Sequence, residues 1–139
     1  MEPTERKAVR VDGGVERSVI EVGGVRFGHD PFPVIAGPCA IESEEQLSTV
    51  AEAVAEAGGS VLRANAYKLG SSPYDFRGLG EAGLVMLEGV GAAVGLPTVT
   101  QVLEPAHVEA AAERVDMIEI HSRSMQNFPL LTEVGRAYG

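Results

Sequence analysis

Val34-Ile-Ala-Gly-Pro-Cys-Ala-Ile-Glu-Ser43 is the stretch that decides the fold of this chain. Its first three residues are apolar and predict a buried strand, which runs into a Gly-Pro turn carrying the only cysteine, Cys39. In enzymes that alternate strands and helices, reactive side chains are found at the carboxyl ends of strands. A lone cysteine is also a common small hydrophobic core residue. This stretch alone leaves both interpretations of Cys39 open.

The pattern of strand followed by helix occurs four times from Pro33 onward. Ser43 and Gln46 form a capping box, and the apolar residues behind them recur on one helical face until Gly58. Further strands are predicted at 60–64, 97–102 and 117–120. Further helices are predicted to end at Gly95, to begin near Pro105 and to begin near Asn127. Strict alternation predicts an α/β fold with a parallel sheet and helices packed outside it.

The segment before these units has a different composition. Residues 1–17 are polar and charged without apolar periodicity, which predicts a mobile tail. Within 18–32, two short β-prone runs flank the pair Gly23-Gly24, and this pattern predicts a small β-hairpin. The four β/α units then occupy residues 33–139.

Composition excludes several classes of function. No apolar run approaches the roughly 18 residues that a membrane span needs. A formal net charge of −9 opposes non-specific binding to nucleic acid. The first residues lack an apolar segment of the secretory type, and a single cysteine forms no internal disulfide. We therefore expect a cytoplasmic protein that binds neither nucleic acid nor a membrane.

Three cationic side chains are placed at the ends of predicted strands. Arg63 and Lys68 lie at or after the second strand, and Arg123 follows the fourth. Any one of them alone is typical of a solvated rim. Together, at the ligand-binding edge of a parallel sheet, they favour an anion pocket, because guanidinium and ammonium groups bind phosphate and carboxylate. The pattern predicts a phosphorylated, carboxylated small molecule as ligand.

Four motifs in this order resemble those of the 3-deoxy-7-phosphoheptulonate (DAHP) synthase family, type I beta branch, which shares a superfamily with the 3-deoxy-octulosonate 8-phosphate synthases. They are Ile35-Ala-Gly-Pro-Cys-Ala-Ile-Glu-Ser43, Leu62-Arg-Ala-Asn-Ala-Tyr-Lys68, Ser72-Pro-Tyr-Asp-Phe-Arg-Gly-Leu-Gly80 and Arg123-Ser-Met-Gln-Asn127. The resemblance implies the first half of a TIM-type (β/α)8 barrel behind the hairpin. It also implies a transferase that condenses phosphoenolpyruvate with erythrose 4-phosphate, the first step of the shikimate pathway to aromatic amino acids.

The resemblance also implies roles for individual residues. Cys39 would be a thiolate ligand of a divalent metal ion, which would polarise the aldehyde of the sugar phosphate as a Lewis acid. Arg63, Lys68 and Arg123 would hold phosphoenolpyruvate, with Lys68 as the candidate catalytic proton donor. The loop that receives the sugar phosphate would contain Ser71, Ser72 and Pro73.

Several positions depart from the family pattern. Ala64-Asn65 replaces a Gly-Gly pair, Gly70 replaces an arginine expected on the sugar phosphate, and Gln101 replaces an acidic residue. The last departures are Ser124, which replaces an asparagine, and His121, which replaces a small residue and is expected to line the site. His29 and His107 are expected at the surface. The departures leave the acceptor open between erythrose 4-phosphate and a different aldose phosphate.

The family pattern continues beyond residue 139 into a fifth strand and further metal ligands, so these units correspond to an apparently truncated barrel. Either they are a fragment of a longer enzyme, or they form a four-unit half barrel. The alternative function is that of a non-catalytic half-barrel remnant that binds anionic ligands or a partner synthase. Because a half barrel leaves two open strand edges, we expect a homo-oligomer.

Overall fold

The computed structural model describes residues 19–28 and 31–138. The tail predicted at 1–17 and the surface position predicted for His29 lie outside the described residues. None of the helices in the described ranges combines the length and the apolar character needed to cross a membrane.

The predicted hairpin is confirmed. Strands β1 (Ile20–Val22) and β2 (Val25–Phe27) pair antiparallel, with Ile20 opposite Phe27. The turn between them lies against Pro97. A Cβ placed on Gly23 would be only 2.6 Å from the Cβ of Pro97, which shows how closely the two segments approach. Since Pro97 directly precedes the third strand of the main sheet, the hairpin turn lies at the amino-terminal end of that sheet.

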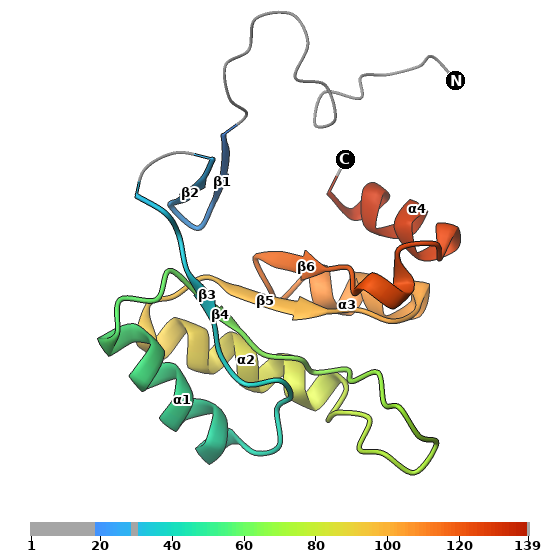
Figure 1. The fold of residues 1–139 in the computed structure, drawn as a ribbon, viewed down its shortest axis with the longest axis horizontal. Coiled ribbons are helices and arrows are strands. Elements are labelled where there is room, and N and C mark those ends of the chain that lie inside the picture. Colours follow the sequence, from blue (N-terminus) through green and yellow to red (C-terminus); the bar gives the residue numbers. More distant parts are fainter. Residues whose placement is uncertain (1–18, 29–30, 139) are drawn as a thin grey trace, which may run out of the picture.

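The main sheet has four parallel strands in chain order, as predicted (Figure 1). They are β3 (Ile35–Ala36), β4 (Val61–Arg63), β5 (Thr98–Gln101) and β6 (Met117–Glu119). In this register Leu62 is opposite Thr98, and Gln101 is opposite Glu119. The carboxyl ends of β4, β5 and β6 therefore lie beside one another.

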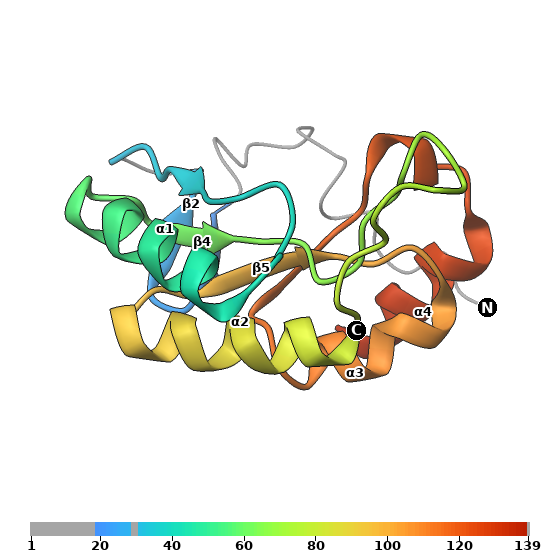
Figure 2. The ribbon, with the colours of Figure 1, turned by 90° about the horizontal axis from the view of Figure 1, so that it is seen from below.

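Helices lie along one side of this curved sheet, three of them between successive strands and the last after β6 (Figures 1 and 2). They are α1 (Glu44–Glu56), α2 (Glu81–Val94), α3 (Val108–Ala112) and α4 (Phe128–Ala137). The capping box is confirmed, since Ser43 Oγ accepts a hydrogen bond from the Gln46 backbone N–H at 3.1 Å. Asn127 caps α4 in the same way through Leu130 N at 3.2 Å.

The helix expected from Pro105 differs from the prediction. A 3₁₀ turn, η1 (Pro105–His107), precedes only five α-helical residues. Such turns are frequent at helix starts, where the first backbone N–H groups have no partner inside the helix. The expected apolar face is nevertheless present, because Val108, Ala111 and Val115 are all buried.

One continuous core lies between the helices and the outer face of the sheet. Its fully buried members are mostly leucine, valine and isoleucine: Ile41, Leu47, Leu62, Leu84, Leu87, Val102, Val108 and Leu130. Burying each such side chain stabilises the fold by roughly 1.5–3 kcal/mol. This core fixes the strand ends that carry the polar residues described below.

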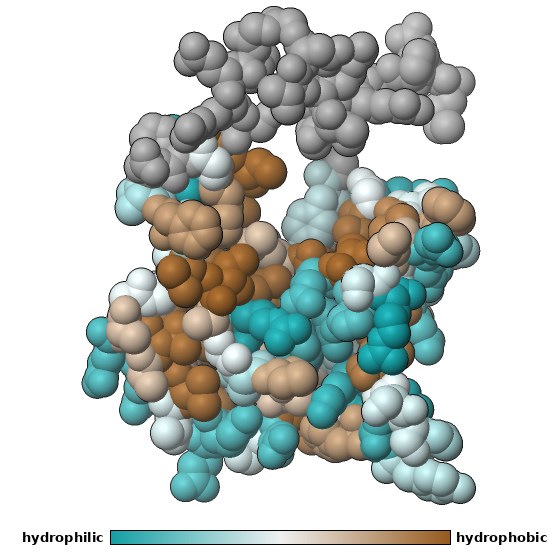
Figure 3. Space-filling view, in the orientation of Figure 1, coloured by the Kyte–Doolittle hydropathy of each residue, from teal (hydrophilic) through white to brown (hydrophobic). Residues whose placement is uncertain are grey.

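In the described part of the chain, the sheet is open at both edges, β3 and β6. The strand predicted to be buried at 34–36 is instead an exposed edge, since Val34 and Ile35 are 47% and 44% exposed. An apolar groove beside them is lined by β3, the outer face of α1 and the turn at 57–59. Hydrophobic residues gather over the hairpin, β3 and α1 in Figure 3, whereas hydrophilic residues cover the middle of the sheet.

Candidate functional site

The turn after β3 brings Cys39 to the surface. Gly37 makes this possible, because a Cβ at this position would overlap the backbone carbonyl oxygen of Arg63. Beyond the turn, the Ile41 N–H donates to the Asn65 carbonyl at 3.1 Å, which ties the chain to the end of β4. Cys39 is therefore an exposed free thiol on a fixed backbone, and the buried interpretation is excluded.

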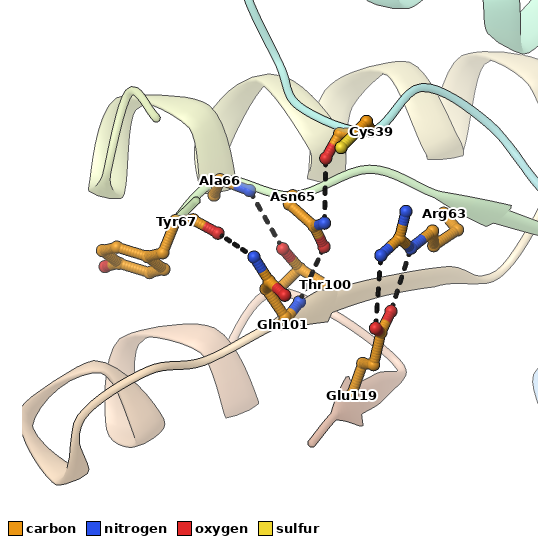
Figure 4. Close-up of polar contacts among 8 residues, drawn as sticks. All are labelled: Cys39, Arg63, Asn65, Ala66, Tyr67, Thr100, Gln101 and Glu119. Atoms are coloured by element: carbon orange, nitrogen blue, oxygen red, sulfur yellow. Dashed lines mark hydrogen bonds and ion pairs between the residues drawn. The ribbon is translucent and has the colours of Figure 1, made fainter. Parts of the chain in front are cut away.

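A buried polar network joins the ends of β3, β4 and β5 (Figure 4). Asn65 Nδ2 donates to the Cys39 carbonyl at 2.8 Å, and Asn65 Oδ1 accepts from the Gln101 N–H at 3.1 Å. Gln101 Nε2 donates to the Tyr67 carbonyl at 2.7 Å. Asn65 and Gln101 are only 2% and 3% exposed. Buried polar groups need such partners, so this network sets the mutual positions of the three strand ends.

Arg63 reaches from β4 across the inner face of the sheet to Glu119 on β6 (Figure 4). Its Nε donates to Glu119 Oε2 at 2.9 Å, and its Nη2 donates to Oε1 at 3.2 Å. The two side chains are 27% and 31% exposed. The pair is thus bidentate and partly shielded from water, which is the strong geometry for an arginine and a carboxylate. The guanidinium of Arg63 is at the expected strand end, but it is already paired with the Glu119 carboxylate.

Lys68 begins the loop between β4 and α2. Its N–H donates to the Arg77 carbonyl at 2.8 Å, which closes the base of this loop. Gly78 beside that closure has φ +91°, and a Cβ there would overlap the Ala66 carbonyl. Among the described residues, the Lys68 ammonium has no carboxylate partner within ion-pair distance. Lys68 therefore keeps its charge available at the loop base.

The two serines of this loop hold an internal anion. The Ser71 and Ser72 N–H groups donate to Asp75 Oδ2 at 2.6 and 2.8 Å, and Ser71 Oγ donates at 3.1 Å. These hydrogen bonds, led by that of Ser72, hold the pKa of Asp75 below its ordinary value. Gly70 fits this loop closely, since a Cβ there would lie 2.7 Å from the Asp75 Cβ. A larger side chain at Gly70 is therefore compatible with this loop only if Asp75 moves.

Arg123 reaches the same loop from the segment that follows β6. It lies in the 3₁₀ turn η2 (Ser122–Ser124), where its N–H donates to His121 Nδ1 at 3.0 Å. Its Nη2 donates to the Leu69 carbonyl at 3.4 Å, next to Lys68. His121, predicted to line the site, is half-buried and caps this turn. The structure thus brings Arg123 to the Lys68 loop.

The donors for a divalent metal do not assemble in the described residues. No three histidine, cysteine, aspartate or glutamate side chains come together in ranges 19–28 and 31–138. Divalent metal sites in proteins need several such ligands. The residues present do not fit a complete metal site, and we derive no step through a metal ion.

His107, which is expected at the surface, is only partly exposed. Its ring stacks on Tyr67 with centroids 3.8 Å apart and planes 9° from parallel. Its Nδ1 is buried and has no hydrogen-bond partner among the described residues. Partial burial of the Tyr67 phenol raises its pKa, and the negative charge of Glu81 raises it further. His107 therefore packs against the chain segment that leads to Lys68.

Two residues of this site, Asn65 and Glu119, have no role in the sequence-based predictions. Asn65 is there only a departure from the family pattern, and Glu119 only part of a strand. Each is a polar residue between apolar ones, in Ala64-Asn-Ala66 and Ile118-Glu-Ile120. A polar side chain inside an apolar strand must find a partner, and this signal points to both residues.

Comparison with known proteins decides the family. Residues 9–138 match the DAHP synthetase I family. The chain belongs to this family. The expected family is therefore confirmed over nearly the whole chain.

Individual members of the DAHP synthetase I family and related enzymes agree with this assignment. Phospho-2-dehydro-3-deoxyheptonate aldolase of Thermotoga maritima is 42% identical over 120 residues, which are 86% of this chain and 36% of that protein. 2-Dehydro-3-deoxyphosphooctonate aldolase of Magnetococcus marinus is 43% identical over 72% of this chain and 38% of that protein. The chain thus spans little more than a third of the length of these relatives.

Solved structures agree with the predicted fold. The crystal structure of the Thermotoga maritima DAHP synthase superposes with a TM-score of 0.79 at 40% identity, over 86% of this chain and 34% of that chain. A truncated form of the same synthase gives a TM-score of 0.73 over 42% of its length. The four β/α units and the hairpin therefore have the fold of about a third of a DAHP synthase chain.

Proposed function

We propose that this chain carries the phosphoenolpyruvate-binding part of a DAHP-synthase-type active site. The observation that carries the proposal is the hydrogen bond of Arg123 to the Leu69 carbonyl, which places a guanidinium beside the Lys68 loop at the carboxyl edge of the sheet. Family membership supports the aldol-type condensation of phosphoenolpyruvate with an aldose phosphate. The product in the family is 3-deoxy-7-phosphoheptulonate, at the start of the shikimate pathway.

The proposed roles follow the chemistry of each side chain. Arg63 and Arg123 bind the phosphate and carboxylate through their planar N–H groups, and Lys68 adds a positive charge and is the candidate proton donor. Ser71, Ser72 and Pro73 belong to the proposed acceptor loop. Because the Ser71 and Ser72 N–H groups hold Asp75, the acceptor phosphate must compete with this carboxylate. Cys39 is proposed to contribute one thiolate to a divalent metal site whose other ligands are not among the described residues.

Binding of phosphoenolpyruvate by the 139-residue chain tests the proposed ligand. Arg123→Ala and Lys68→Ala each remove one charged contact, worth roughly 1.5–3 kcal/mol, and each should weaken binding about ten- to hundredfold. Arg136→Ala removes an equal charge from an exposed pair on α4 and should leave affinity unchanged. Equal affinities for all four proteins in calorimetric titrations would refute the proposed site.

A second candidate function is anion binding without catalysis, by a half-barrel remnant or as a partner of a complete synthase. The single thiol without companion ligands in the described residues favours it for this chain alone. Loss of phosphoenolpyruvate in the presence of an aldose phosphate separates the two. Turnover that requires a divalent metal and is abolished by Cys39→Ala supports the enzyme, whereas metal-independent binding without turnover supports the remnant.

A further inference from the structure

Arg63, a residue of the proposed anion site, has an internal carboxylate partner. Glu119 engages Nε and Nη2 of the guanidinium through both of its carboxylate oxygens, at 2.9 and 3.2 Å. We propose that Glu119 is a specificity-determining residue that competes with the anionic ligand for Arg63. This inference rests on the proposed function, because it concerns the phosphate and carboxylate groups that Arg63 is proposed to bind.

The geometry leaves an arriving anion two options. It displaces Glu119 from the guanidinium, or it binds the remaining N–H groups while the Glu119 carboxylate stays beside it. In the first case the ligand must break a bidentate ion pair, and in the second it meets a like charge only a few ångströms away. Both options weaken binding relative to a site in which position 119 is neutral. Partial burial of the pair, with 27% and 31% exposure, limits screening by water.

The backbone carbonyl of Glu119 accepts from the Val102 N–H, but its side chain has a single partner among the described residues. Its side chain forms its hydrogen bonds there only with Arg63, and its neighbours in β6 are the apolar residues Met117 and Ile118. Two of the family departures lie nearby in the structure: Gln101, opposite Glu119 in the register, and Asn65, two residues after Arg63. Repulsion from a carboxylate at 119 grows with the negative charge of the ligand. Glu119 therefore lowers the affinity for a polyanion such as phosphoenolpyruvate more than the affinity for a monoanion such as acetate.

The test compares Glu119→Gln with the wild-type chain, using phosphoenolpyruvate and acetate as the titrated ligands. Glu119→Ala is the second variant, because it removes the charge without placing a new amide beside Arg63. The matched control is Glu88→Gln, since Glu88 pairs with Arg114 at the same 2.9 Å but on the helical side of the sheet. All proteins are first compared by circular dichroism and thermal unfolding.

We expect Glu119→Gln to bind phosphoenolpyruvate about tenfold tighter, the fold-change that removal of one adjacent like charge produces at a partly shielded site. Acetate, with a single negative charge, should gain less, so the ratio of the phosphoenolpyruvate affinity to the acetate affinity should rise. Glu88→Gln should match the wild-type chain. A folded Glu119→Gln or Glu119→Ala variant with unchanged or weaker affinity would overturn the role of Glu119.

The binding measurements distinguish failure of the role of Glu119 from failure of the proposed phosphoenolpyruvate site. If the wild-type chain binds phosphoenolpyruvate through Arg123 and Lys68, but neither Glu119 variant binds more tightly, only the role of Glu119 is refuted. If neither the wild-type chain nor any Glu119 variant binds phosphoenolpyruvate, both the role of Glu119 and the proposed function are refuted.

Discussion

The side-chain amide of Asn65 donates a 2.8 Å hydrogen bond to the backbone carbonyl of Cys39. This contact joins the loop that carries the only thiol to the end of the neighbouring strand, and the same side chain accepts from Gln101 N. Asn65 is 2% exposed, so bulk water does not supply these hydrogen bonds in its place. The exposed Cys39 thus depends on a buried amide for its position.

Replacing Asn65 with alanine should lower the free energy of unfolding by about 1–3 kcal/mol, because the Cys39 carbonyl and the buried Gln101 N–H lose their partner. Urea unfolding followed by circular dichroism measures this change. Gln126→Ala, at an exposed position in the loop before α4, should change stability by less than about 0.5 kcal/mol. Equal stability of the two variants would show that the Asn65 bonds contribute nothing.

Gly37→Ala should destabilise the chain by about 2–4 kcal/mol, because its Cβ overlaps the Arg63 carbonyl and its φ of +148° is unfavourable for alanine. Gly89→Ala is the matched control in α2, where a Cβ meets open space. That change should stabilise the chain by roughly 0.5–1 kcal/mol through helix propensity. The unfolding midpoints of the two variants should therefore move in opposite directions.

Gln101→Glu should make stability depend on pH. The Gln101 amide donates to the Tyr67 carbonyl, and a carboxyl group can donate there only when it is protonated. Burial and this hydrogen bond should raise the folded-state pKa of Glu above its unfolded value. The folded variant then binds more protons, so its stability is greatest below the unfolded pKa and falls as pH rises through the folded pKa.

Thermal unfolding between about pH 4 and pH 8 measures this effect. The midpoint of Gln101→Glu should fall relative to the wild-type midpoint as pH rises. A constant difference between the two proteins across this range would contradict the prediction.

The Asp75 carboxyl should titrate below the ordinary aspartate range, because the Ser72 and Ser71 N–H groups stabilise its charged form and lower its pKa. Its contribution to stability is therefore present above the unfolded pKa and is lost as pH falls through the folded pKa. Carboxyl carbon NMR measures the pKa directly, with Asp75→Asn to assign the signal. Ser71→Ala removes one hydroxyl donor and should move the pKa upward, whereas an unshifted titration would show that the loop is not closed in this way.

Most of the fold could be predicted from the sequence because it depends on local signals. The apolar periods, the capping box at Ser43 and the glycines at Gly58 and Gly95 set the helix ends, and chain alternation alone gives a parallel sheet. The helix near Pro105 is the exception. Its first turn is 3₁₀ and its α-helical part is short, and periodicity does not distinguish these two backbone forms.

For the site, the sequence predicts which strand ends carry charged residues, but it does not predict the contacts of their side chains. The placement of Arg123 beside the Lys68 loop follows from strand order, which the sequence pattern contains. The pairing of Arg63 with Glu119 does not follow, because it spans 56 residues and depends on the reach of one side chain across β5. The position of His107 could not be predicted for the same reason, since its stacking on Tyr67 joins two loops that are distant in the sequence.

The network of Asn65 and Gln101 has a consequence for how such a chain diverges from its relatives. Asn65 Oδ1 accepts from the backbone N–H of residue 101, a donor that every residue type except proline carries. Substitution of the Gln101 side chain therefore keeps this hydrogen bond, whereas an apolar residue at position 65 removes it. Because Asn65 also donates to the Cys39 carbonyl, position 65 joins three strand ends and should restrict sequence divergence more than position 101 does.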